Sequence, residues 1–310
     1  MITFAVFHYD MPAALRRLFM PHGQDVEFDF VGMLDLALRS AERFHPGCQK
    51  VVLTDLVTDF SRLPRDVRII RHPIDPTQAL FDRAVAQRDF LVRHDFASHV
   101  ILMDSDVLIN NELESSFDGS FDVGLTYRSI KAMPLNAGLI ALHAGRSRAA
   151  VTFFDAMLRA MRAHYSSDPG WLWLSDQFGL IEAVGRQAFW ARTEDRLQTD
   201  DGVRIRLWPC ETHNDSVINE WRAILVRDPR RRVLHFKGDV KRLMQPYWSA
   251  HLDGDRSVAG RAAQRTWLVA LAVAEFLSQG AKAPDQLAMR LFRAMSRRAR
   301  RLAARLSRER

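Results

Sequence analysis

The stretch Val100-Ile101-Leu102-Met103-Asp104-Ser105-Asp106-Val107-Leu108-Ile109 decides the fold that we predict for this chain. Its beginning, up to Met103, is uniformly apolar, which is the pattern of a central parallel strand buried on both faces. Ligands of open α/β sheets bind beyond the carboxyl ends of such strands, so we expect Asp104 and Asp106 at the binding edge. Two adjacent carboxylates repel each other unless a cation lies between them, and hard oxygen ligands suit Mg²⁺ or Mn²⁺. Turn chemistry alone also favours aspartate here, so other parts of the chain must decide.

Strands and helices are predicted to alternate before this stretch. The expected elements are strands at 2–7, 50–55 and 67–70 and helices at 28–44 and 77–92, the second capped by Thr77. This alternation is typical of a doubly wound nucleotide-binding sheet. The sequence contains no G-x-G-x-x-G and no Walker A motif, which argues against a dinucleotide-binding fold and a P-loop NTPase.

The remaining elements follow a less regular order. They are strands at 121–126, within 134–143, at 203–207 and at 232–236, and helices at 146–164 and 175–184, the latter capped by Ser175. From residue 262 onward only helices are predicted. Because Asp253 to Ser257 has the composition of a boundary, we expect an α/β domain over residues 1–252 and a helical extension over 253–310.

Composition indicates a globular protein of the cytosol. The chain has 310 residues, 47% of them hydrophobic, which is enough for a substantial core. Cys48 and Cys210 are too few for a disulfide framework and are expected to be small buried residues in a reducing compartment. No signal peptide and no membrane-spanning run are predicted.

The positive charge is confined to the C-terminal end. The net charge is +7, yet residues 281–310 alone hold ten basic and two acidic residues, so the remainder carries −1. Apolar residues recur there at helical spacing with arginines between them, which favours an amphipathic helix on an anionic membrane surface. A solvated helix packed on the body is the alternative. Nucleic acid is not an expected partner, since aromatic residues do not alternate with the basic ones.

Four fragments offer groups suited to binding and catalysis. The first is the pair of aspartates in Asp104-Ser105-Asp106, and the second is Asn136-Ala137-Gly138, an amide beside a residue small enough for close approach of a ligand. Asp176-Gln177 offers a carboxylate and an amide at the expected start of a helix. His235-x-x-Gly238-x-x-Lys241 offers a third metal ligand, a permissive backbone and a cation.

In this order and rough spacing, the fragments resemble the retaining glycosyltransferases of the GT-A fold. The most similar family includes glycogenin and the bacterial lipooligosaccharide galactosyltransferases. The resemblance covers residues 2 to about 248, and its most specific piece is the His-x-x-Gly-x-x-Lys arrangement. It implies an α/β fold with a GT-A type nucleotide-sugar-binding mixed sheet flanked by helices over residues 1–252, with a C-terminal helical extension.

The resemblance also implies roles for individual residues. The expected metal ligands are Asp104, Asp106 and His235; the expected substrate-binding residues are Tyr9, Arg83, Asp104, Asn136, Gly138, Gly238 and Lys241; and the expected catalytic residues are Asp176 and Gln177. The implied reaction is metal-dependent transfer of a hexose from a nucleotide-diphospho-sugar, with UDP as the expected nucleotide. The acceptor is a hydroxyl of a cell-surface saccharide or a lipid-linked glycan, and the enzyme is expected in the cytoplasm or peripherally on the cytoplasmic face of the membrane.

The chain departs from the family pattern in two places. His8-Tyr9-Asp10 stands where the family often has Asp-x-Asn-Tyr for the base, and Arg242-Leu243 follows the lysine in place of Pro-Trp. Two other functions are therefore alternatives to a glycosyltransferase. A sugar nucleotidyltransferase shares this type of sheet, but the glycine-rich basic loop expected after its first strand is absent. A non-catalytic membrane- or nucleic-acid-binding protein on a degenerate transferase fold is the other.

Several residues also have purely structural interpretations. Asp176 is a candidate nucleophile by analogy with retaining hydrolases, whereas the resemblance implies that it binds the sugar and that retention proceeds without a covalent intermediate. Arg83 is as compatible with a solvated helix face as with the donor. The tryptophans that could stack on sugars, but are more simply core residues, are Trp171, Trp173, Trp208 and Trp248.

Overall fold

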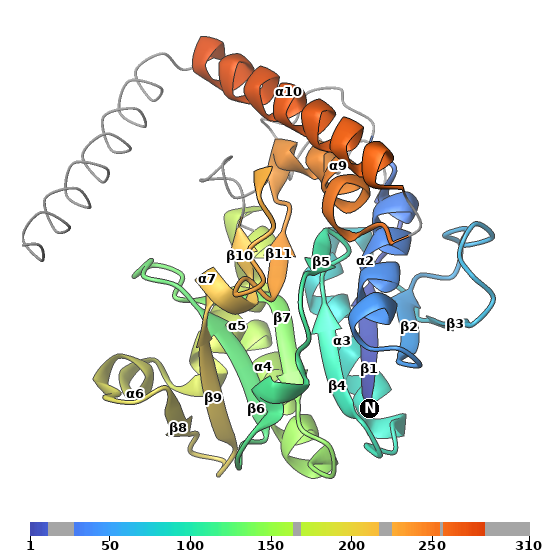
Figure 1. The fold of residues 1–310 in the computed structure, drawn as a ribbon. Helices are drawn as coiled ribbons and strands as arrows, with labels where there is room; N and C mark the ends of the chain where they lie inside the picture. The colour runs from blue at the N-terminus through green and yellow to red at the C-terminus, as the bar shows by residue number, and fades with distance from the viewer. Residues whose placement is uncertain (12–27, 164–168, 217–224, 255–256, 283–310) are drawn as a thin grey trace, which may run out of the picture.

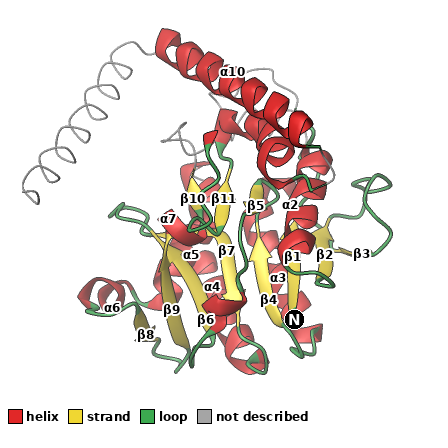
Figure 2. Cartoon of the chain, viewed as in Figure 1, coloured by secondary structure: helices red, strands yellow, loops and turns green. Residues whose placement is uncertain are grey.

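In a computed structural model, the chain forms an eight-stranded sheet covered by helices and a smaller three-stranded sheet (Figures 1 and 2). The structure describes residues 1–11, 28–163, 169–216, 225–254 and 257–282. The large sheet contains β1 (Ile2–Phe7), β2 (Gln49–Thr54), β3 (Val67–Arg71), β4 (His99–Met103), β6 (Val123–Tyr127), β7 (Leu135–Leu142), β8 (Arg196–Gln198) and β9 (Arg204–Pro209). The predicted α/β class, with a mixed sheet flanked by helices, is confirmed.

The large sheet has the order β3-β2-β1-β4-β7-β6-β9-β8. Neighbours from β3 to β4 are parallel, β7 is antiparallel to β4, and β6 returns to the direction of β4 and pairs in parallel with β9. The apolar run Val100–Met103 is buried at the centre, as predicted, although only one of its two neighbours is parallel. The carboxyl ends of β1, β4, β6 and β9 therefore share one edge with the beginning of β7.

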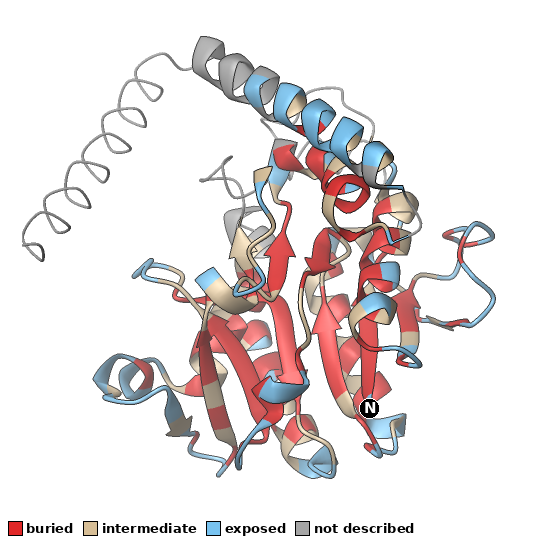
Figure 3. Cartoon of the chain, in the orientation of Figure 1, coloured by how far each residue is buried: buried red, intermediate tan, exposed pale blue. Residues whose placement is uncertain are grey.

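Helices cover both faces of this sheet because β4 alternates its side chains between two cores. The larger helices are α2 (Phe30–Phe44), α3 (Ala79–Arg93), α4 (Ser147–Ala163) and α5 (Pro169–Val184). Ile101 and Met103 pack in the same core as the apolar face of α2. Val100 and Leu102 face the opposite core, which contains the buried side chains of α3, α4 and α5. Figure 3 shows the strands buried between these layers.

Residues Val107 to Ile109, which follow the two aspartates, belong to a small sheet that the sequence did not predict. This sheet consists of β5 (Val107–Ile109), β10 (Asp215–Ser216) and β11 (Val233–His235). β11 runs antiparallel to β5, with His235 opposite Val107, and β10 is parallel to β11. The chain thus leaves the large sheet at Asp104 and enters the small one at Val107, so both aspartates lie at the junction of the two sheets.

The C-terminal part packs on the same side as α2. It contains η4 (Gly238–Leu243), α9 (Met244–Tyr247), η5 (Trp248–Leu252) and α10 (Val258–Lys282). The hydroxyl of Tyr247 donates to Asn110 Oδ1 at 3.0 Å, and Leu268 of α10 joins the core of α2. No helix in the described part of the chain is long and apolar enough to cross a bilayer. The boundary predicted at residue 253 coincides with a turn before α10, and the division into two domains stays a prediction.

Shorter elements complete the described chain. They are η1 (Pro76–Gln78), η2 (Glu114–Phe117), α6 (Arg186–Ala191) and α7 (Cys210–His213). Cys48 and Cys210 are free and buried, as expected. Trp208 and Trp248 are buried core residues, whereas the side chains of Trp171 and Trp173 lie outside the described set.

Two predicted helix caps were wrong. The side chain of Asp75 accepts from the backbone of Thr77, so Asp75 caps the short helix η1 and α3 begins only at Ala79. A 3₁₀ turn is a common way to begin an α-helix and shifts the apparent start. Ser175 lies inside α5, which begins at Pro169, because proline is tolerated in the first helical turn.

Leu102→Ala is expected to lower the free energy of unfolding by about 2–5 kcal/mol, because this leucine is fully buried in β4 and its truncation leaves a cavity. Leu56→Ala is the matched control, since Leu56 is 62% exposed. The control should change stability by less than about 0.5 kcal/mol. Urea unfolding followed by circular dichroism measures both. Equal effects would contradict the burial of β4 on both faces.

Candidate active site

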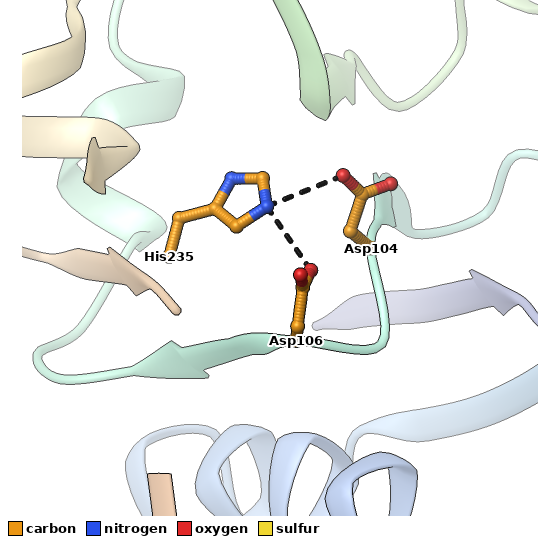
Figure 4. Close-up of side chains that lie close together, drawn as sticks. All are labelled: Asp104, Asp106 and His235. Atoms are coloured by element: carbon orange, nitrogen blue, oxygen red, sulfur yellow. Dashed lines mark ion pairs between the residues drawn. The ribbon is translucent and has the colours of Figure 1, made fainter. Parts of the chain in front are cut away.

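Asp104, Asp106 and His235 form a compact cluster at the junction of the two sheets (Figure 4). The Nε2 atom of His235 lies 3.4 Å from Asp104 Oδ2 and 3.0 Å from Asp106 Oδ1. Each residue has one ligand atom, a carboxylate oxygen or an imidazole nitrogen, that lies within 4.8 Å of the corresponding atoms of the other two. Two carboxylates and an imidazole form a donor set that fits a divalent cation.

The backbone of β4, β5 and β11 holds these side chains in place. The amide of Asp104 donates to the Gly138 carbonyl at 3.1 Å, and the amide of Phe236 donates to the Asp106 carbonyl at 2.8 Å. Together with the pairing of His235 and Val107, these bonds bring residues 104–106 and 235 to one point. Residues more than a hundred positions apart therefore meet through strand pairing.

Position 138 has no room for a side chain, because the His235 ring lies against the backbone there. A Cβ atom at residue 138 would lie 2.5 Å from His235 Cε1 and 2.7 Å from its Nδ1. The sequence predicted close approach of a ligand at this glycine, and the structure shows that the chain's own histidine makes the approach. The register between β6 and β7 shifts between Leu125 and Thr126, opposite this part of β7. Such irregularities re-aim backbone groups next to functional sites.

A hydrogen-bond network orients the His235 ring. Its Nδ1 lies 2.8 Å from Asn214 Oδ1, while Asn214 Nδ2 donates to Thr126 Oγ1 at 3.0 Å and to Asn136 Oδ1 at 3.1 Å. Because the amide nitrogen serves two acceptors, Oδ1 must accept, and His235 Nδ1 therefore carries a hydrogen. The Nε2 atom of the ring faces the two carboxylates, in the position from which it would join them as a metal ligand.

Asn136 has a structural role in the same network. Its side chain is buried, and its Oδ1 accepts from the Gly138 amide at 2.8 Å as well as from Asn214. This oxygen is therefore engaged within the protein, and the ligand contact predicted for Asn136 would have to use Nδ2. Asn214 itself was not singled out from the sequence. It follows the short helix α7 and has no distinctive local pattern, so only the tertiary contacts identify it.

A buried arginine and a half-buried lysine neutralise the carboxylates. Arg83 Nη1 lies 2.8 Å from Asp104 Oδ1 and 3.7 Å from Asp176 Oδ2, and Arg83 Nη2 donates to the Ala137 carbonyl at 3.0 Å. The alternative in which Arg83 lies on a solvated helix face is wrong, since its side chain is buried. Lys241 Nζ lies 2.5 Å from Asp106 Oδ2. Burial acts to raise the pKa of Asp106, but the charges of Lys241 and His235 outweigh it and hold that pKa well below its usual range.

Asp176 and Gln177 lie next to the cluster on α5. Asp176 Oδ1 accepts from the Gln177 amide at 2.7 Å, and its other oxygen faces Arg83. Burial raises the pKa of Asp176, and the charge of Arg83 opposes this shift. Gln177 Oε1 accepts from Arg128 Nη2 at 2.7 Å. Within the described chain, the Nε2 group of Gln177 is thus the part of this amide without a hydrogen-bond partner.

Gly238 and Tyr9 follow strands of different sheets, β11 and β1. Gly238 has φ +59°, and a Cβ atom there would meet nothing within 4 Å, so its backbone faces open space. Tyr9 follows β1, with its ring 6.0 Å from that of Phe7. Burial, aided by the charge of Asp55, raises the pKa of Tyr9 to about 12. No contact found among the described residues joins Tyr9 to the metal cluster.

Sequence reasoning missed two basic residues near the cluster, Lys237 and Arg128. Burial lowers the pKa of Lys237; the charge of Asp104 opposes this shift and that of Arg128 adds to it. Lys237 lies inside the His-x-x-Gly segment, so its position next to a metal ligand was a usable signal. Arg128 directly follows β6 and carried no such signal, because only the fold brings it to Gln177.

No protein-family profile matches this chain, and no curated protein is similar to it in sequence. Among solved structures, the galactosyltransferase LgtC, determined with donor and acceptor sugar analogues, is 14% identical; the alignment covers 88% of this chain and 96% of LgtC, with a TM-score of 0.46. The glycosyltransferase GlyE of Streptococcus pneumoniae is 13% identical over 90% of this chain and 63% of its own, with a TM-score of 0.45. A glycosyltransferase involved in the glycosylation of the major capsid of PBCV-1 is 13% identical. The alignment covers 79% of this chain and 98% of that protein, with a TM-score of 0.47.

Asn214→Ala is expected to weaken Mn²⁺ binding by about 10–100-fold, because it removes the acceptor that orients the His235 ring. Asn111→Ala is the control, since the amide of Asn111 donates to the Pro229 carbonyl and not to the cluster. Titration with Mn²⁺ followed by electron paramagnetic resonance measures the affinity, and thermal unfolding checks the fold. A folded Asn214→Ala variant with wild-type affinity would show that this network does not tune the site.

Proposed function

We propose that the chain is a metal-dependent glycosyltransferase of the GT-A fold. It would transfer a hexose from a nucleotide-diphospho-sugar, with UDP as the nucleotide, to a hydroxyl of a saccharide or a lipid-linked glycan. The observation that carries the proposal is the Asp104–Asp106–His235 cluster, with Lys241 beside it, at the carboxyl edge of β4. This edge is where open α/β sheets bind their ligands.

The cluster would hold Mn²⁺ or Mg²⁺, which would neutralise the diphosphate as it leaves the sugar. Lys241 would provide a second positive charge for the same group, and the open space beside Gly238 would admit it close to the backbone. Arg83 would keep Asp104 oriented while it neutralises Asp176. Tyr9, at the carboxyl end of β1, would be the residue nearest the base.

Asp176 and Gln177 would act on the transferred sugar. Because one oxygen of Asp176 accepts from the Gln177 amide and the other faces Arg83, Asp176 is better suited to binding a sugar hydroxyl than to attacking carbon. The Nε2 group of Gln177 would donate to the sugar or to the departing oxygen. These contacts support retention by displacement on one face of the sugar, without a covalent intermediate.

UDP binding that requires Mn²⁺ is the expected result for the wild-type protein, and Asp106→Ala should abolish it by removing a carboxylate ligand. Asp200→Ala, which removes an exposed aspartate outside the cluster, should bind as the wild type does. Calorimetric titration of a panel of nucleoside diphosphates, with and without Mn²⁺, measures this.

Binding of another nucleotide in the same metal-dependent way would retain the enzyme class and change the donor. Absence of binding by every nucleotide would overturn the proposal and favour a non-catalytic protein on a degenerate transferase fold. Incorporation of a nucleotide into a sugar phosphate would instead identify a nucleotidyltransferase.

We also propose that the enzyme associates peripherally with the cytoplasmic face of a membrane, where a lipid-linked glycan would be available. Residues 281–310 carry a charge of +8, and all but Ala281 and Lys282 lie outside the described residues. Within α10, Trp267 is 56% exposed, and Val269 and Val273 are each 40% exposed. Apolar side chains followed in sequence by clustered arginines suit an anionic lipid surface.

The full chain is expected to sediment with vesicles that contain phosphatidylglycerol but not with vesicles of phosphatidylcholine alone, and 0.5 M salt should release it because exposed charges are then screened. Replacing the nine arginines of residues 290–310 by glutamine should abolish sedimentation and leave UDP binding unchanged. Sedimentation of this variant equal to that of the wild type would remove the membrane proposal.

A further inference from the structure

Arg128 and Lys237 differ from the other cations of the site because neither has an acidic partner among the described residues. Arg83 and Lys241 are each ion-paired, at 2.8 Å and 2.5 Å. By contrast, Arg128 donates only to neutral oxygens, from Nε to the Met133 carbonyl at 2.8 Å and from Nη2 to Gln177 Oε1 at 2.7 Å. Lys237 is half-buried, and its side chain makes no hydrogen bond within the described chain.

Asn214 joins the two segments that carry the unpaired charges. Its Nδ2 donates to Thr126 Oγ1 at 3.0 Å and its Oδ1 lies 2.8 Å from His235 Nδ1, and Arg128 and Lys237 each follow one of these two residues by two positions. In agreement with this placement, the charge of Arg128 adds to the lowering of the pKa of Lys237 by burial. Cys210 lies within range of both cations, but burial raises the pKa of its thiol, so it does not supply a negative charge at neutral pH. Two partly desolvated cations of like charge are unfavourable unless an anion joins them.

The order of the strands shows which part of a substrate would meet this pair. Tyr9 follows β1, Asp104 follows β4, and Arg128 follows β6 on the far side of β4 from β1. Arg128 therefore lies away from Tyr9 and in contact with Gln177. If the base lies toward Tyr9 and the diphosphate at the metal cluster, the Arg128 side of the edge faces the sugars.

We infer that Arg128 and Lys237 form a subsite for a carboxylate or phosphate group carried by one of the two sugar substrates. The guanidinium of Arg128 would bind the anion with the donors that Gln177 and Met133 leave free, and Lys237 would add a point charge. The inference rests on the proposed function and specifies its substrate class, which is an acidic acceptor glycan or an acidic donor sugar.

Matched neutral and anionic sugars test the subsite. In the acceptor arm, glucose, glucose 6-phosphate and glucuronate are titrated into protein saturated with UDP and Mn²⁺, with the corresponding galactose compounds as a second series. In the donor arm, UDP-glucuronate is compared with UDP-glucose. The anionic member of one arm is expected to bind at least about tenfold more tightly than its neutral counterpart.

Substitutions assign this preference to the two residues. Lys237→Gln and Arg128→Gln should each reduce the preference toward unity, whereas Lys237→Arg should retain most of it because the charge is kept. Lys131→Gln is the control, since Lys131 is an exposed lysine between β6 and β7 and should leave the preference unchanged. The affinity of each variant for UDP reports whether its donor site is folded.

Equal binding of anionic and neutral sugars in both arms, by a protein that binds UDP, would overturn the subsite alone. A preference that survives both glutamine substitutions would do the same. If Lys237→Gln weakens UDP as strongly as it weakens the anionic sugar, Lys237 belongs to the diphosphate and the subsite is overturned. A wild-type protein that binds no UDP would overturn both this inference and the proposed function.

Discussion

The mutual repulsion of Asp104 and Asp106 is the constraint on which the rest of the site depends. The two carboxylates are separated by one residue at the point where the chain leaves the large sheet and enters the small one. Neither can be buried without opposite charge, and the fold supplies it from separate directions. Arg83 arrives from α3 on one face of the sheet, while His235 and Lys241 arrive from β11 and η4. Each element is thus positioned around this pair.

Buried ion pairs of this kind contribute little to stability, because the desolvation of each charge offsets the attraction between them. Their arrangement is better understood as preparation for a ligand. The network from Thr126 through Asn214 to His235 fixes the direction of one imidazole nitrogen, and Gly138 makes room for its ring. These contacts restrict the side chains before any cation or substrate binds, which lowers the cost of ordering them later.

The charge distribution along the binding edge is uneven, and this asymmetry has chemical meaning. Arg83 and Lys241 each have a carboxylate partner, whereas Arg128, at the carboxyl end of β6, contacts only neutral oxygens among the described residues. A diphosphate with its metal would suit the first region, and an acidic sugar would suit the second. Because β7 lies between β4 and β6 in the sheet, the two regions have a fixed order along this edge.

The sequence alone indicated the class of fold and the residues of the metal cluster, because buried strands and short polar motifs are local patterns. The apolar run before Asp104 predicted a buried strand, and the resemblance that His235, Gly238 and Lys241 carry predicted a metal and diphosphate site. Helix caps at Thr77 and Ser175 were wrong, since neighbouring Asp75 and Pro169 set those starts. Only the tertiary structure decided the antiparallel position of β7, the small sheet, and the roles of Asn214 and Arg128. Such contacts join residues that are distant in sequence through strand pairing and packing, and no local pattern encodes which partners will meet.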